Sequence, residues 1–175
     1  MRDGTRGSLG QVLGGVALFG ALMLFGLITR PLAGMLSGLY GFHAVLAALP
    51  FSFSIAFALR KGVALPVCFL AVAFFSAVLF SMSPIMGLSS LLPMIGAAFV
   101  SVAVGRVWPE WRSRAAGLTY GSLFYPCTLV VSGGFGVLTR TAVVDEWPIM
   151  LVSTLLGAVL ALVGAVLASG TSSSN

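Results

Sequence analysis

The longest uncharged stretch of the chain decides its fold. Residues 62–105 have the sequence GVALPVCFLAVAFFSAVLFSMSPIMGLSSLLPMIGAAFVSVAVG, without one charged side chain. A transmembrane helix needs about 20 predominantly apolar residues, so this stretch is long enough to cross a bilayer twice. A turn between the two crossings is expected near residues 81–84 and 87–90, where small polar residues, Pro and Gly interrupt the apolar pattern.

The overall composition indicates a membrane protein. Of the 175 residues, 59% are hydrophobic and 7% are charged, whereas about a quarter of a soluble domain is charged. Strands of a membrane barrel alternate apolar and polar residues, but residues 67–80 are apolar on every face. We therefore predict an all-α integral membrane protein.

The charged residues also mark the limits of the remaining helices, because a charge at mid-membrane costs at least ~2.5 kcal/mol. They separate four more uncharged stretches, each long enough for one crossing, at residues 7–29, 31–59, 115–139 and 147–175. The first of these resembles a signal peptide, but it is too long and lacks an obvious cleavage site, so we expect it to be retained. We predict a single transmembrane domain, a six-helix bundle with spans at 9–29, 38–59, 62–81, 87–105, 114–134 and 148–168, and a short polar tail at 169–175.

The basic residues predict the orientation of this bundle, because Lys and Arg are retained on the cytoplasmic side. With the N-terminus inside, every basic residue except Arg30 and Arg140 falls on the cytoplasmic side. An even number of crossings returns the chain to that side. Both termini are therefore predicted to be cytoplasmic.

Residues for catalysis or energy conversion are missing from the predicted spans. The acidic residues all lie in loops or at the N-terminus: Asp3, Glu110, Asp145 and Glu146. This weakens the interpretation as a proton-coupled antiporter. One histidine, no Gly-rich phosphate loop and two cysteines in apolar runs indicate neither an enzyme, an ATP site nor a metal site. The basic residues are scattered, so a nucleic-acid partner is not expected either.

Candidate ligand-binding residues gather on the predicted outer side of the membrane. They are Arg30, Tyr40, His43, Ser83, Met86, Arg140, Asp145, Glu146 and Trp147. Arginine and carboxylates would pair with a polar ligand, and Trp147, after a flexible glycine-rich stretch at 133–136, would stack on it. The alternative is that these residues anchor the chain at the interface or are solvated loop charges. The sequence leaves both interpretations open.

Two helices carry small residues at helical spacing. The first span has Ala17 and Ala21 on one face, and the last has Gly157, Ala161, Ala165 and Ala168. Small residues let another helix approach closely in a membrane. Such faces either hold the bundle together or contact another chain.

In outline, the chain resembles the substrate-binding S components of energy-coupling factor (ECF) transporters. The shared features are the size, six spans, both termini inside and the pair Ala17 and Ala21 in the first span. The stretch from residue 49 to residue 62, with Pro50 and Arg60-Lys61, is similar to the MptD or Trep_Strep type.

This resemblance implies a multi-pass protein of a bacterial or archaeal plasma membrane that captures a vitamin-like small molecule near the outer face. It also implies that Ala17 and Ala21 contact a membrane coupling (T) subunit. Two cytoplasmic ATPases would then bind the ATP, so this chain needs no cofactor of its own. Two other hypotheses remain open: a structural or assembly membrane protein without a ligand, and a membrane enzyme that uses His43.

Overall fold

The computed structural model describes the backbone of residues 3–36, 42–136 and 140–170, and the side chains of residues 8–32, 42–136 and 146–170. Within these ranges the chain is helical, which confirms the predicted all-α class. The elements are α1 (Asp3–Leu36), α2 (Phe42–Arg60), α3 (Leu65–Met82), α4 (Pro84–Val107), the 3-10 turn η1 (Pro109–Trp111), α5 (Arg112–Gly134) and α6 (Arg140–Gly170). Each of the six predicted segments coincides with one helix.

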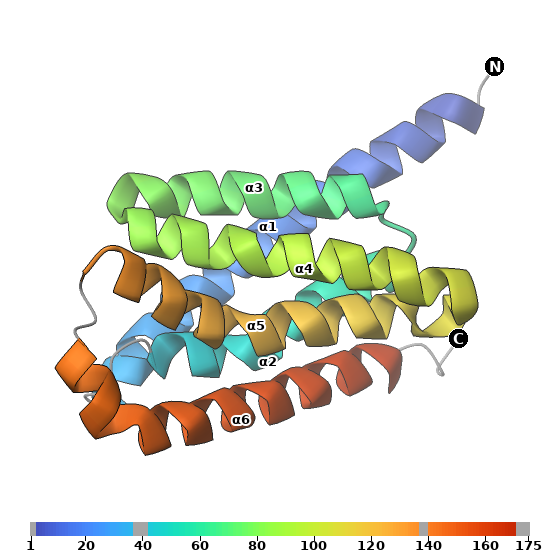
Figure 1. Ribbon diagram of the computed structural model, residues 1–175. Helices are drawn as coiled ribbons and strands as arrows, with labels where there is room; N and C mark the ends of the chain where they lie inside the picture. The colour runs from blue at the N-terminus through green and yellow to red at the C-terminus, as the bar shows by residue number, and fades with distance from the viewer. Residues whose placement is uncertain (1–2, 37–41, 137–139, 171–175) are drawn as a thin grey trace.

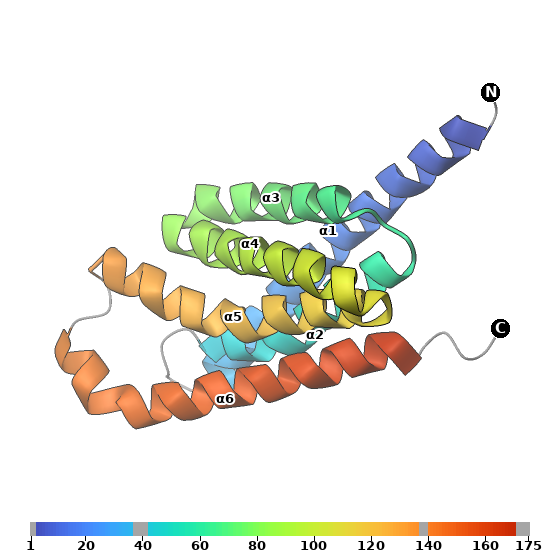
Figure 2. The same cartoon turned by 45° about the vertical axis from the view of Figure 1, so that its right-hand side comes forward.

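The helices form a bundle in which α2 and α5 are central. Helix α2 packs against α1, α5 and α6, and α5 packs against α2, α4 and α6. Helices α3 and α4 lie side by side, and the first turns of α1 extend beyond the bundle at the end where both chain termini lie (Figures 1 and 2). The loops that connect the helices therefore lie at the two ends of the bundle.

Five helices are long and apolar enough to cross a membrane, which is the pattern of a multi-pass membrane protein. The apolar segments are Ser8–Leu32, Phe42–Arg60, Leu65–Met82, Pro84–Val107 and Glu146–Gly170. Helix α5 has the length of a span but is less apolar. Its buried face carries Tyr120, Thr128 and Ser132, which meet other helices instead of lipid. A central position therefore explains the lower hydropathy of α5.

The turn between α3 and α4 is a single residue. Ser83 is extended (φ −159°, ψ 124°), and Pro84 begins α4 at a position where a missing N–H costs nothing. The expected interruption at residues 87–90 is wrong, because these residues are helical. Ser89 and Ser90 donate their hydroxyl hydrogens to the carbonyls of Ile85 (2.6 Å) and Gly87 (2.9 Å) of the same helix, so their polarity does not break it.

Two segments predicted as outer loops are helical. Helix α1 continues through Arg30 and Pro31 to Leu36, and α6 begins at Arg140, eight residues before the predicted span. Helix α6 changes direction after its first turns (Figures 1 and 2). Pro148 explains this bend, because it has no N–H for the carbonyl four residues earlier and its ring crowds that carbonyl.

Small residues bring α6 against the centre of the bundle. Ala161, Ala165 and Ala168 are at most 2% exposed. A Cβ atom on Gly121 of α5 would lie 2.7 Å from both the Ala48 carbonyl oxygen and the Ala161 Cβ. Ser52 of α2 donates a 2.6 Å hydrogen bond to the Ala161 carbonyl. The small-residue face of the last helix therefore packs inside the bundle.

Two glycines of α6 provide a matched test of this packing. A Cβ on Gly164 would clash with the backbone of Leu49 and Phe53, whereas a Cβ on Gly157 would meet nothing within 4 Å. We expect Gly164→Ala to destabilise the protein by about 1–3 kcal/mol through overpacking. Gly157→Ala should be neutral or slightly stabilising, because alanine favours helix. Thermal unfolding in detergent measures both; equal melting temperatures for the two variants would contradict the tight α2–α6 contact.

Candidate ligand-binding site

A cavity of about 250 Å³ opens at the end of the bundle where α1 ends, α2 begins and α3 turns into α4. Five helices, α1 to α5, contribute side chains to it. The polar residues that line it are Thr29, Arg30, His43, Ser83, Ser89 and Thr128, and the larger apolar ones are Met23, Leu27, Phe51, Phe75, Leu79, Met82, Ile85, Met86 and Phe124. The site is concave and mainly apolar with a few polar groups, which is typical of small-molecule sites.

Four of the candidate residues from the sequence line this cavity together: Arg30, His43, Ser83 and Met86. They come from α1, α2, the α3–α4 turn and α4. Glu146 and Trp147 are exposed and are not among the residues that line this cavity, so the described structure does not bring them together with the other four. Tyr40 and the side chains of Arg140 and Asp145 lie outside the described residues.

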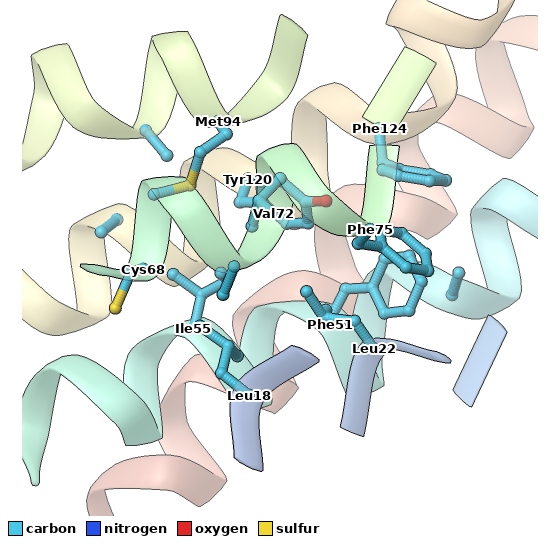
Figure 3. Packing of buried hydrophobic residues seen from close by; sticks show 14 of the residues in the cluster. Leu18, Leu22, Phe51, Ile55, Cys68, Val72, Phe75, Met94, Tyr120 and Phe124 are labelled. Atoms are coloured by element: carbon cyan, nitrogen blue, oxygen red, sulfur yellow. The ribbon is translucent and has the colours of Figure 1, made fainter. Parts of the chain in front are cut away.

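Aromatic rings close the cavity on its inner side. Phe51 follows His43 by eight residues along α2, so it lies about 12 Å deeper. Its ring meets those of Phe75 at 5.6 Å and Phe124 at 5.1 Å, both edge to face. Figure 3 shows Phe51 and Phe75 together near the centre of the bundle, with Phe124 close to them. We call Phe51, Phe75 and Phe124 the aromatic floor.

A buried polar contact lies beside the aromatic floor, at Ser76, which directly follows Phe75 on α3. The Ser76 and Ser90 hydroxyls are 2.8 Å apart and join α3 to α4. Tyr120 is fully buried and donates a 3.2 Å hydrogen bond to the Ser90 carbonyl. These contacts fill the space between α3, α4 and α5. The cavity therefore ends at the floor as a pocket.

Three hydroxyl groups of the cavity already donate their hydrogens within their own helices. Thr29 donates to Phe25 (2.9 Å), Ser89 to Ile85 (2.6 Å) and Thr128 to Phe124 (2.9 Å), each through a backbone carbonyl. Their oxygens still have lone pairs that accept hydrogen bonds. Among the described lining residues, the N–H donors that remain for a ligand are those of Arg30 and His43.

The opposite end of the bundle is basic and held by structural contacts. Arg60 donates to the Ala168 carbonyl (3.2 Å) and to the Ser169 carbonyl, and so satisfies the C-terminal end of α6. Arg112 donates to Ser101 at 3.3 Å. Gln11 of α1 donates to the Gly62 carbonyl (2.8 Å) and accepts from the Ala64 N–H (2.6 Å). These contacts tie α2 to α6, α5 to α4, and α1 to the loop between α2 and α3.

Several lining residues gave no signal in the sequence. Phe51, Phe75 and Phe124 lie in apolar runs where an inward-facing ring and a lipid-facing ring look alike. Only the packing of α2, α3 and α5 separates them from exposed rings such as Phe99. The polar residues near helix ends were identifiable because polar groups are rare in this chain.

Comparison of the chain with protein families, with curated protein sequences and with solved structures finds no match. No group of three or more His, Cys, Asp and Glu side chains that could hold a metal ion occurs within the described residues. The residues that line the cavity therefore define its chemistry.

The aromatic floor can be tested by truncation. Phe51 is 2% exposed and contacts three rings, whereas Phe99 of α4 is 75% exposed. Phe51→Ala should lower the free energy of unfolding by about 3–5 kcal/mol through lost packing and an enlarged cavity. Phe99→Ala should change it little. Denaturation in detergent followed by circular dichroism compares the two, and a Phe51→Ala variant as stable as Phe99→Ala would show that the floor is not packed as described.

Proposed function

We propose that this chain is the substrate-capture subunit of an ATP-driven importer of the energy-coupling factor type. It takes up a vitamin-like small molecule in the cavity and does not transform it. Partner chains supply the energy: a membrane coupling subunit and two cytoplasmic ATPases. The observation that carries this proposal is a pocket walled by five helices, open at one end of the bundle and closed within it by the aromatic floor. A pocket of this kind suits binding and release on one side of a membrane better than conduction across it.

The charge distribution supports an outward-facing pocket. Arg60, Lys61, Arg106, Arg112 and Arg114 all lie at the bundle end opposite the cavity, at the ends of α2, α4 and α5. Lys and Arg are retained on the cytoplasmic side. The cavity then faces outward, α5 also crosses the membrane and makes six crossings in all, and both termini are cytoplasmic. The membrane is a bacterial or archaeal plasma membrane.

The outer surface of α1 supports a second contact. Within the described residues, the backbone of α1 lies close only to α2 and α3, and Arg30 near its end contacts Met86 of α4. Ala17 is exposed and Ala21 is half-buried, next to exposed Leu13 and Leu24. In contrast to Ala161 and Ala165 of α6, Ala17 is not used to pack the bundle. A small exposed residue in a membrane helix permits close approach of a partner helix, and we assign this face to the coupling subunit.

This assignment predicts a separation of binding from transport. Replacing Ala17 and Ala21 together with leucine should block close approach of the coupling subunit. Ligand binding should remain unchanged, because neither residue lines the cavity. Uptake and co-purification of the ATPases should fall to background in cells that carry the variant.

A matched control uses two alanines on other exposed helix faces. Ala77 of α3 and Ala103 of α4 are exposed, so their double replacement with leucine should leave both uptake and co-purification intact. Unchanged uptake in the Ala17/Ala21 variant would contradict the assigned face. A wild-type protein that retains neither a small molecule nor ATPases would instead support the structural or assembly hypothesis.

The proposed orientation can be tested by cysteine labelling. Ser81 lies at the cavity end and Glu110 at the basic end, and both are exposed. After replacement of the native Cys68 and Cys127 with alanine, Ser81→Cys should react with a membrane-impermeant maleimide in intact cells. Glu110→Cys should react only after the membrane is opened. The reverse pattern would invert the topology and place the cavity on the cytoplasmic side.

A further inference from the structure

Arg30 is the one charged side chain that lines the cavity within the described part of the chain. It lies in the last turns of the apolar helix α1 and is half-buried. A cation in an apolar span is expensive and generally has a functional partner. The identity of that partner therefore bears on what the cavity binds.

The described residues offer Arg30 no carboxylate. Its guanidinium contacts the Met86 sulfur, and a thioether is only a weak hydrogen-bond acceptor. No acidic side chain lines the cavity among the described residues. The planar guanidinium presents several N–H groups in a geometry that matches a carboxylate or phosphate. An anion inside the cavity would give Arg30 the partner that these residues lack.

The rest of the cavity is suited to an apolar group. Met82 and Met86 form part of its wall near the α3–α4 turn, and Met23 of α1 lines it deeper, one turn before Gly26, which lies against the Phe51 and Phe75 rings of the aromatic floor. Methionine adapts to irregular shapes and makes favourable contacts with rings. The volume of about 250 Å³ is below the range of roughly 300–1,000 Å³ for sites of drug-sized ligands. The ligand must be compact.

A soft metal ion is the competing ligand. Thioethers together with the imidazole of His43 are donors that suit Cu(I). Arg30 lies in the same wall and contacts Met86, one of these thioethers. Its positive charge opposes a cation at this place and favours an anion.

The geometry points to a compact organic anion as the ligand of this cavity. Its carboxylate or phosphate group pairs with Arg30, with His43 as a second hydrogen-bonding group, and its apolar body lies between the methionines and the aromatic floor. This inference rests on the proposed function, because it specifies the chemical class of the molecule that the chain captures.

The test compares what the wild-type protein and three variants carry after gentle purification from their own membranes. Native mass spectrometry and analysis of the released compound identify the ligand, and metal analysis measures copper. Arg30→Gln removes the charge, Arg30→Lys retains it without the planar fork, and Arg114→Gln removes an arginine at the opposite end as a control. Thermal unfolding of each variant checks that it is folded.

We expect an acidic compound in the wild type and in Arg114→Gln. Its occupancy should be at least about tenfold lower in folded Arg30→Gln and intermediate in Arg30→Lys. A neutral or cationic compound, bound copper, or equal occupancy in wild type and Arg30→Gln would overturn the anionic class but leave the capture of a small molecule standing. No bound species in any variant would overturn the proposed function and this inference together.

Discussion

The constraint on which the structure depends is that a bilayer accepts neither unpaired backbone groups nor unpaired charge. The first condition requires helices, because a helix satisfies its backbone hydrogen bonds within one segment. The second moves the basic residues to one end, where Arg60 and Arg112 form structural hydrogen bonds. Among the basic side chains that the structure describes, Arg30 is the exception, because it lies inside an apolar helix and lines a cavity. The proposed chemistry of the site follows from this exception.

Helix positions were predictable because charge and Pro mark them strongly in so apolar a chain. The six segments coincide with α1 to α6, and Ser83 and Pro84 separate α3 from α4. The end of α1 near residue 30 and the start of α6 near residue 140 were less predictable. A helix can extend beyond the apolar core of the membrane, and charged residues are then part of the helix and do not mark its end. Arg30 and Arg140 show this at the end of α1 and the start of α6.

The candidate site was predictable only in its polar part. Arg30, His43, Ser83 and Met86 come from separate segments and meet at one cavity, whereas Glu146 and Trp147 are exposed elsewhere. The direction of a side chain around its helix depends on packing, and a helix that is apolar on most faces gives no contrast between inward-facing and lipid-facing positions. For the same reason the aromatic floor could not be predicted from the sequence, although the Phe51 ring of α2 contacts rings of α3 and α5.

The two small-residue patterns show why spacing alone does not assign a contact. In α6 the alanines are buried against α2 and α5, and Gly164 leaves no room for a side chain. In α1, Ala17 is exposed. The same spacing thus holds the bundle together in one helix and leaves a surface in another. Together with the cavity at the opposite end from the basic loops, this surface gives the proposed subunit separate places for ligand and partner.

Capture of a small molecule in the cavity can be tested with a crystal structure of the protein purified from its own membranes without added ligand. We expect electron density for a compact molecule in the cavity, in contact with Arg30 and His43 and resting on Phe51. A cavity that is collapsed, or occupied only by a lipid chain entering between the helices, would contradict it.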